Sequence, residues 1–401
     1  MMNALNGKRV KDVPLKFLDM KFLFVVQGEG RGHFTQALAM KELLCQRGDE
    51  VVGVMVGKSE TRELPEFFTR KIGVSVWTFS SPNFLPTAHG KRPGLVKSVL
   101  YNILHLPDYN RSVKYVRRQI KESGAEVVIN FYELLTGVAC FFNLYQIPLI
   151  CIGHQYLFLH SDFSFPEGSS RIQLFFLRFF TRLTALGATR KLALSYYPLA
   201  PDGASDMVVV PPLIRREVKE TRPFQGDYIL GYLLNNGYVS EVKAWHDCHS
   251  EVCLHFFWDK KEETECLELA PGLTMHRIDD VAFIRYMAGC RAYSTTAGFE
   301  SVCEALYLNK PIVMVPVHIE QECNAFDAVR MGAGIVSDSF DLDGLLGSIS
   351  SYNPQSGFKE WVDSAERLIY SELHQVAVAQ KELSITYYFH RLRHKLSFSF
   401  K

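Results

Sequence analysis

Short apolar runs alternate along the chain with longer segments of helix-forming composition. The first half contains five such runs, which predict strands at 22–28, 51–57, 74–79, 126–131 and 148–153. The second half repeats the pattern at 228–234, 252–258, 273–278, 291–295 and 311–316. Strands that are apolar throughout are typical of parallel sheets covered by helices on both faces. The pattern therefore predicts two α/β domains of Rossmann-like organisation.

The segment between the two series changes from an apolar strand, MVVV, to a charged stretch that contains prolines. This composition is typical of an interdomain linker and places the boundary near Arg215 to Gly226. We therefore expect an N-terminal domain over 20–214 and a C-terminal domain over 226–377. From 358 to about 392 the sequence contains helix formers without a strand pattern, so terminal helices are expected.

Composition limits the partners and the compartment. Lys and Arg number 44 against 43 Asp and Glu, a net charge of +1, which disfavours nucleic acid as a partner. Nine cysteines without a CxxC pair indicate reduced thiols, and hence a cytoplasmic protein, rather than a disulfide framework or a zinc site. The residues before Met20 are polar and do not have the pattern of a signal peptide, and Met20 is an alternative start.

One apolar segment, residues 171–191, has the composition of a helix that contacts a membrane. Its aromatic residues and leucines are interleaved with basic residues at Arg171, Arg178, Arg182, Arg190 and Lys191. The arginines prevent it from spanning a bilayer unaided, but such a helix suits the surface of an anionic membrane. A core helix with a solvated basic face is the alternative, and the sequence leaves both open.

A glycine-rich turn, GEGRGH, follows the first predicted strand. Gly28, Gly30 and Gly32 lack side chains just before a predicted helix, so backbone can approach a ligand closely. His33 would lie at the N-terminus of that helix, where a neutral imidazole can accept a proton from a hydroxyl group. A tight turn or a dinucleotide-binding loop are the alternatives. The spacing is GxGxG rather than GxGxxG, which disfavours NAD and leaves NADP open.

A second candidate site follows the strand at 291–295. Small residues from Thr295 through Thr296 and Ala297 to Gly298 precede a predicted helix, and exposed backbone amides at a helix N-terminus suit a diphosphate. Glu304, two turns further on, could accept from the two vicinal hydroxyls of a ribose; an exposed helical acid is the alternative.

The loop after the strand at 311–316 completes this candidate site. Glu320 and Gln321 offer acceptors and donors for sugar hydroxyls, and Asn324 would start or cap the next helix.

The motifs GFESVCEAL and PVHIEQECN are similar to the donor-binding signature of GT-B glycosyltransferases, and GEGRGH resembles their N-terminal glycine-rich loop. The resemblance is to the UDP-glycosyltransferases and to the bacterial enzyme that adds N-acetylglucosamine to lipid I, and it covers about 20–336. It implies two Rossmann-like domains that face each other across a cleft. It also implies that a C-terminal helix, 378–401, packs back on the N-terminal domain.

The same resemblance implies roles for the donor-site residues. The turn from Thr296 to Gly298 would bind the diphosphate, Glu304 the ribose, and Glu320 and Gln321 the sugar hydroxyls, with Ser301 and Asn324 at matching positions. Many relatives have a phosphate-contacting His where this chain has Thr296. A hydroxyl can replace its hydrogen bond but not its positive charge.

On the acceptor side, the resemblance implies that His33 is the catalytic base or contacts the acceptor. Relatives often carry an acidic motif after the fourth strand, where this chain has NFYELLT. Phe131 replaces the Asp of that motif, so Glu133 is the candidate for orienting or charging His33; a plain helix-start acid is the alternative. His154, at the end of the next predicted strand, is expected to position the acceptor.

The sequence thus predicts a metal-independent glycosyltransferase without a cofactor, which moves a hexose or N-acetylhexosamine from a nucleotide sugar to a hydroxyl acceptor, with a lipid-linked acceptor as one option. The DxD at Asp341 to Asp343 is expected to cap a helix rather than bind a metal. Three alternatives stay open: a GT-B-fold UDP-sugar epimerase, an NADP-dependent oxidoreductase and a noncatalytic sugar-nucleotide-binding protein.

Overall fold

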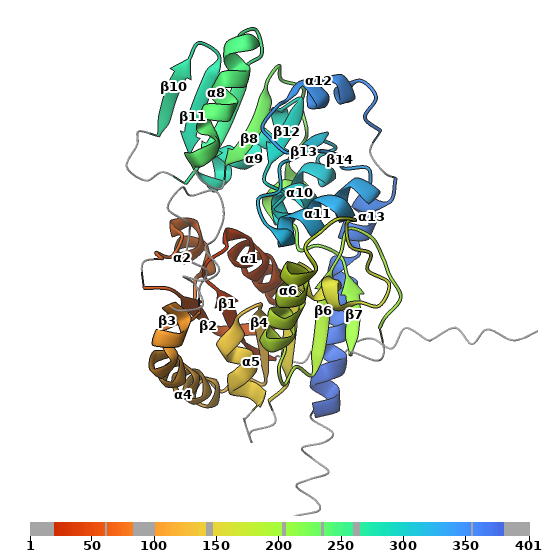
Figure 1. The fold of residues 1–401 in the computed structure, drawn as a ribbon. Coiled ribbons are helices and arrows are strands. Elements are labelled where there is room, and N and C mark those ends of the chain that lie inside the picture. The colour runs from red at the N-terminus through yellow and green to blue at the C-terminus, as the bar shows by residue number, and fades with distance from the viewer. Residues whose placement is uncertain are drawn as a thin grey trace, which may run out of the picture.

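The protein forms two α/β domains, each built around a seven-stranded sheet (Figure 1). The computed structural model describes residues 20–60, 62–82, 101–141, 147–202, 206–233, 236–259, 265–353 and 356–380. All ten predicted strands are present, with slightly shifted ends.

The sheet of the N-terminal domain is parallel, in the order β3-β2-β1-β4-β5-β6-β7. Its strands are β1 (Lys21–Gln27), β2 (Glu50–Lys58), β3 (Val76–Ser80), β4 (Val127–Phe131), β5 (Leu149–Gly153), β6 (Arg190–Leu194) and β7 (Met207–Val210). The helices are α1 (Arg31–Gln46), α2 (Glu66–Ile72), α4 (Leu106–Glu122), α5 (Leu134–Phe141), the 3-10 helix η1 (His154–Leu159) and α6 (Arg171–Thr184). Because the central strands are apolar on both faces, residues 22–26 of β1 are buried completely.

The sheet of the C-terminal domain has the order β10-β11-β9-β8-β12-β13-β14, and β10 is an antiparallel edge strand. Its strands are β8 (Ile229–Leu233), β9 (Leu254–Trp258), β10 (Cys266–Ala270), β11 (Leu273–Arg277), β12 (Ala292–Thr295), β13 (Ile312–Met314) and β14 (Gly334–Val336). The helices are the 3-10 helix η3 (Asn236–Tyr238), α8 (Val239–Cys248), α9 (Asp280–Gly289), α10 (Phe299–Tyr307), α11 (Ile319–Arg330), α12 (Asp343–Ile349) and α13 (Phe358–Asp363). In both sheets the strand order reverses beside the first strand of the domain, which is where ligands bind in folds of this kind.

The chain returns to the N-terminal domain earlier than residue 378. Trp361 Nε1 donates to the carbonyl oxygen of Ser195 at 2.9 Å, and Glu366 pairs with Arg47 at 2.7 Å. A helix over 365–380 then runs along the N-terminal domain, drawn in blue in Figure 1. The predicted start of the returning segment is therefore corrected to about residue 358, and residues 381–401 lie outside the described part of the chain.

The two domains share packing as well as connections. One hydrophobic cluster extends from Phe24 and Phe34 of the N-terminal domain to Phe299 and Met314 of the C-terminal domain. The two domains are therefore packed against each other.

Candidate functional site

A pocket of about 810 Å³ lies between the two domains. The N-terminal domain contributes the glycine-rich turn and one side of α6, and the C-terminal domain contributes the first turns of α10 and α11. A cleft of this size at the switch points of two parallel sheets can hold a ligand of the size of a nucleotide sugar.

The glycine-rich turn reaches the pocket through Gly30 and Gly32. Gln27 Oε1 accepts from the backbone NH of Gly30 at 3.2 Å and so shapes the turn before α1. Gly28 packs against strand β2 instead. Its NH donates to Gly57 O at 2.8 Å, and a Cβ at Gly28 would lie 2.9 Å from that oxygen. The predicted ligand approach at Gly28 is therefore corrected to close strand packing.

His33 lines the pocket from the first turn of α1 and is 8% exposed. Its ring stacks against Tyr132, with ring centroids 5.7 Å apart. Burial lowers the pKa of His33, and the nearby Glu320 carboxylate only partly opposes this. A lowered pKa keeps the imidazole neutral at physiological pH, which is the protonation state a base requires.

Glu133 does not orient His33, contrary to the sequence-based prediction. Its carboxylate is fully buried against Gly57 and accepts hydrogen bonds from Ser81 Oγ at 2.6 Å and from the NH of Thr136 at 2.6 Å. Tyr132 adopts a left-handed backbone conformation, with φ of +62°, and lies beside His33 in the pocket lining. The loop after β4 therefore presents Tyr132 to the pocket and holds Glu133 in the turn, where it stabilises the start of α5.

His154 is part of the packing between the domains. It is 1% exposed, its Nδ1 lies 2.7 Å from Leu194 O, and its ring stacks on Phe299 with centroids 3.9 Å apart. Burial lowers the pKa of His154 to about 3, so the ring is neutral. This placement behind Phe299 corrects the prediction that His154 positions the acceptor.

The turn from Thr296 to Gly298 brings the N-terminus of α10 to the pocket. Ala297 has φ of +62°, a strained conformation for a residue with a side chain and one that often marks a functional turn. Thr296, Gly298 and Ser301 line the pocket, whereas Thr295 and Ala297 are completely buried behind it. The N-cap residue of α10 is Gly298, which has no side chain, so NH groups of the first turn other than that of Glu300, which bonds the Glu300 carboxylate, can face an anion.

The first turns of α11 hold this site in place. Gln321 Oε1 accepts from the NH of Val317 at 3.0 Å, and Asn324 Nδ2 donates to Ala297 O at 3.1 Å. Glu320 Oε1 accepts from Gln155 Nε2 of the N-terminal domain at 2.9 Å. All three predicted residues, Glu320, Gln321 and Asn324, line the pocket, but each also has a structural partner.

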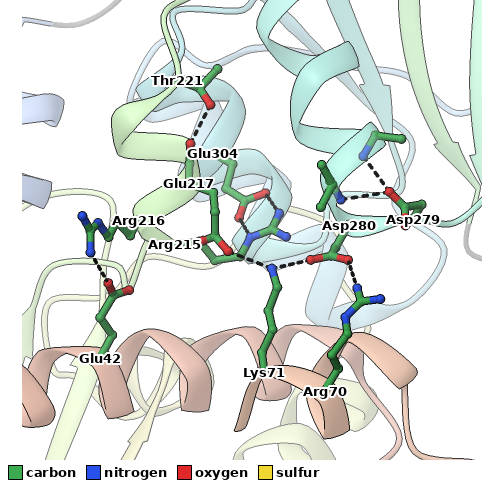
Figure 2. Close-up of polar contacts among 12 residues, drawn as sticks. Glu42, Arg70, Lys71, Arg215, Arg216, Glu217, Thr221, Asp279, Asp280 and Glu304 are labelled. Carbon is green, nitrogen blue, oxygen red and sulfur yellow. Dashed lines mark hydrogen bonds and ion pairs between the residues drawn. The ribbon is translucent and has the colours of Figure 1, made fainter. Parts of the chain in front are cut away.

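Glu304 is held by Arg215, which the sequence assigned to the linker. Figure 2 shows the guanidinium of Arg215 in a two-point contact with this carboxylate, and both side chains are buried. Arg215 lies just before α7 (Arg216–Glu220), and Arg215 and Glu304 both line the pocket. Arg215 is therefore a site residue rather than part of a solvated linker.

An ionic cluster joins the domains at the edge of the pocket. Lys71 Nζ of α2 lies 2.5 Å from Asp280 of α9 and 2.7 Å from Glu217 of α7, and Arg70 lies 3.6 Å from Asp280 (Figure 2). Asp280 is 5% exposed in its side chain, so this contact is partly shielded from water. The cluster stabilises the packed arrangement of the domains.

Arg31, Tyr132, Arg215 and Glu300 also line the pocket, and the sequence did not predict them as site residues. Arg31 begins α1 immediately after the glycines, and its guanidinium lies 4.8 Å from the centroid of the Phe67 ring. Its position inside the motif GEGRGH could have identified Arg31 as a site residue, since it places a positive charge at the turn.

The DxD is part of a helix start, as predicted. Asp341 Oδ1 accepts from the NH of Asp343 at 3.0 Å, and Asp343 Oδ1 accepts from Trp245 Nε1 at 2.9 Å. In the part of the chain that the structure describes, no three His, Cys, Asp or Glu side chains are arranged to hold a metal ion. Among the same residues, no helix has the length and apolar character needed to cross a membrane.

Comparison with known proteins decides the family. The family model described as Glycosyl transferase family 1 matches residues 20–348. The chain belongs to this glycosyltransferase family. A search of curated protein sequences gives no match.

Solved structures agree with the family in fold, at low sequence identity. UGT89C1 of Arabidopsis thaliana, complexed with quercetin, has a TM-score of 0.59 and 13% identity, with 90% of this chain and 100% of that chain covered. The spinosyn forosaminyltransferase SpnP has a TM-score of 0.57 and 15% identity, with 90% and 100% covered. UGT71G1 of Medicago truncatula, complexed with UDP-glucose, has a TM-score of 0.57 and 14% identity, with 91% and 98% covered.

This glycosyltransferase therefore has the GT-B fold that its motifs resemble. The family match disfavours both the epimerase and the oxidoreductase alternatives.

Proposed function

We propose that this glycosyltransferase moves a hexose or N-acetylhexosamine from a nucleoside diphosphate sugar, first of all a UDP-sugar, to a hydroxyl acceptor. The observation that carries the proposal is that His33 and the N-terminus of α10 line one pocket from opposite domains. A neutral base facing an anion-binding helix end suits the displacement of a nucleoside diphosphate by a hydroxyl group. UGT71G1, which shares the fold, is complexed with UDP-glucose, and this makes UDP-sugars the first donors to test.

In the proposed reaction, the acceptor oxygen attacks the anomeric carbon of the donor while His33 takes the hydroxyl proton. The bond from that carbon to the diphosphate breaks, and the diphosphate leaves with the electron pair. The first NH groups of α10 and the guanidinium of Arg31 would stabilise the charge that develops on it. Because these groups supply positive potential, we propose a reaction without a metal or a cofactor.

Arg31 can supply the positive charge that is lost where this chain has Thr296 in place of the His of many relatives. A hydroxyl at Thr296 supplies no positive charge to the diphosphate, but Arg31 enters the same pocket from the other domain. Burial lowers the pKa of Arg31, although an arginine stays charged at neutral pH. The positive charge at the diphosphate would then come from the N-terminal domain.

Thermal unfolding with a panel of UDP-, GDP- and dTDP-sugars tests the donor, because a bound ligand raises the apparent Tm. We expect UDP-sugars to give the largest rise, and His33→Ala to abolish transfer while keeping that rise. Equal transfer rates with and without EDTA would support metal independence. Donor binding without transfer by the wild-type protein, across an acceptor panel, would favour the noncatalytic alternative.

We further propose that the acceptor is lipid-linked and that the enzyme works on the cytoplasmic face of a membrane. On α6, Phe175, Phe176 and Phe179 are 62%, 54% and 47% exposed, which is unusual for three aromatic side chains on one helix. Phe176 also lines the pocket, so the apolar surface of α6 continues from solvent into the site. Arg171 and Arg182 of the same helix would attract an anionic bilayer.

Co-sedimentation with vesicles tests this surface. We expect binding to vesicles of phosphatidylglycerol and phosphatidylcholine, weaker binding to phosphatidylcholine alone, and loss of binding in Phe175→Ser/Phe179→Ser. Val336→Ser removes an exposed apolar side chain on β14 of the other domain and serves as the matched control. Equal binding by all three proteins would exclude α6 as the membrane contact.

A further inference from the structure

Glu300 of the C-terminal domain reaches across the pocket to helix α1. Its Oε1 accepts a hydrogen bond from Gln36 Nε2. Gly32 lies directly against the same carboxylate, since a Cβ at Gly32 would be 2.1 Å from Glu300 Oε2. Glu300 is in the first turn of α10 and lines the pocket. The carboxylate is thus packed onto the turn that carries His33, although it belongs to the other domain.

Gln36 connects this carboxylate with His33. The two side chains lie three residues apart on α1, a spacing that places them on the same face of a helix. His33 is 8% and Gln36 1% exposed. Among the described residues, His33 Nδ1 and Gln36 Oε1 are both buried without a hydrogen-bond partner. Because Gln36 uses its NH₂ group on Glu300, its carbonyl oxygen is the atom left for the imidazole.

The structure assigns Glu300 as a positioning residue for His33, acting through Gln36. In this relay the carboxylate orients the Gln36 amide so that Gln36 Oε1 can accept a hydrogen bond from His33 Nδ1–H, which would give both buried atoms a partner. This fixes the tautomer in which Nε2 carries the lone pair and can take the acceptor proton. Where Glu300 is ionised, its negative charge stabilises the imidazolium formed in that step. The inference rests on the proposed function, in which His33 is the base.

The charges around both groups are consistent with this relay. Glu320 of α11 and Tyr132 after β4 face His33, while Glu304 of α10 and Glu320 face Glu300. Burial raises the pKa of Glu300 to about 7, and the Gln36 hydrogen bond acts against that rise. The acid that the sequence placed at Glu133 would therefore come from the opposite domain. Activation of the base would then depend on closure of the cleft.

Two measurements on the full-length enzyme test the relay. Imidazole titration by NMR, with His33→Ala to assign the resonance, reports the pKa of His33 without any substrate. Release of UDP from a UDP-sugar, followed from about pH 5 to pH 9, reports kcat and the donor KM. In Glu300→Gln we expect a lower pKa of His33 and a roughly 10- to 100-fold lower kcat, with the donor KM changed by less than about twofold. Glu300→Asp should recover part of kcat.

Glu42→Gln is the control, because Glu42 is an acid of α1 outside the pocket that pairs with Arg216, in the segment between the domains, at 3.5 Å. It should leave both readouts unchanged. Wild-type titration and kcat in Glu300→Gln would overturn the inference and leave the proposed function intact. Full activity of His33→Ala, or the absence of UDP release by the wild type, would instead contradict the proposed function. The titration still reports the coupling of His33 with Glu300 in that case.

Discussion

The guanidinium of Arg215 holds both carboxylate oxygens of Glu304, with Nε and Nη2 each 2.7 Å from the oxygen that it contacts. A carboxylate has about four acceptor positions, so the same oxygens can still accept from the hydroxyls of a ribose. Arg215 would then fix the direction in which Glu304 presents those positions. This pair connects the segment between the domains with the donor site.

Arg215→Met should destabilise the protein and weaken donor binding. It leaves the buried Glu304 charge without its partner, which costs about 3–5 kcal/mol in the free energy of unfolding. Urea denaturation measures this loss, and the KM of the donor should rise at the same time. Arg216→Met removes an exposed side chain next to it and should change neither value appreciably. Equal stability of the two variants would contradict the role of the pair.

Arg31→Gln should weaken binding of a nucleoside diphosphate but not of the nucleoside. A hydrogen bond to a charged group contributes about 1.5–3 kcal/mol, which corresponds to a roughly 10- to 150-fold higher Kd for UDP. Isothermal titration with UDP and with uridine measures the difference. Arg31→Lys keeps the charge and should retain part of the affinity. An equal loss for UDP and uridine would place Arg31 away from the diphosphate.

Gly32→Ala and Gly30→Ala should differ sharply although they lie two residues apart. A Cβ at Gly32 would be 2.1 Å from Glu300 Oε2, whereas one at Gly30 would meet its nearest atom, in the His33 ring, at 3.5 Å. Gly32→Ala should therefore displace the Glu300 carboxylate from α1 and, through the proposed relay, reduce kcat by at least about tenfold, because catalytic groups act only in close alignment. Gly30→Ala should keep most of the activity. Equal activity of the two variants would show that the position of the Glu300 carboxylate does not affect the reaction.

Lys71→Met should shift the enzyme toward separated domains. Burial lowers the pKa of Lys71, but its hydrogen bonds to Asp280 and Glu217 outweigh this and raise it, so the ammonium is charged at neutral pH. Small-angle scattering should show a larger radius of gyration for the variant without donor, and the donor KM should increase. Arg70→Met removes a longer and more exposed contact to the same carboxylate and should have a smaller effect. A radius of gyration equal to that of the wild type would exclude the cluster as a closing contact.

Asp327 should make stability depend on pH. It accepts from Tyr197 Oη of the other domain at 2.6 Å, and burial raises its pKa to about 6 from an ordinary value of 3.8. Between these pH values the folded state binds more protons than the unfolded state, so the free energy of unfolding falls as pH rises through about 6. Asp327→Asn should remove up to about 3 kcal/mol of this fall between pH 4 and pH 7. Parallel stability curves for the variant and the wild type would contradict the shift.

The sequence predicted the architecture because its signals are local. Apolar runs such as Phe22 to Val26 can only be buried between helices, and the small-residue turn at Thr296 to Gly298 identifies the start of α10 without any tertiary information. The missed strands β6, β10 and β14 are short or carry polar residues, as in RKLAL and CLELA, so the apolar pattern does not mark them.

The site residues that were predicted wrongly or not at all depend on backbone conformation in loops and on contacts between the domains. The positive φ of Tyr132 decides which side chain of the β4 loop enters the pocket, and a sequence pattern does not encode that turn. Arg215 and Glu300 acquire their partners only when the two domains meet. The sequence placed Arg215 at the start of the linker and gave Glu300 no role, because the contacts of both residues depend on segments that are distant in the sequence.

The return of the chain to its first domain has a consequence for synthesis. Trp361 and Tyr370 cover apolar surface of the N-terminal domain, yet they are made only after the entire sheet of the C-terminal domain. During translation the first domain therefore keeps an uncovered flank for as long as the second is being produced. A chaperone that binds apolar surface can bind this flank during that time. Translation that stops before residue 358 should yield an aggregation-prone product.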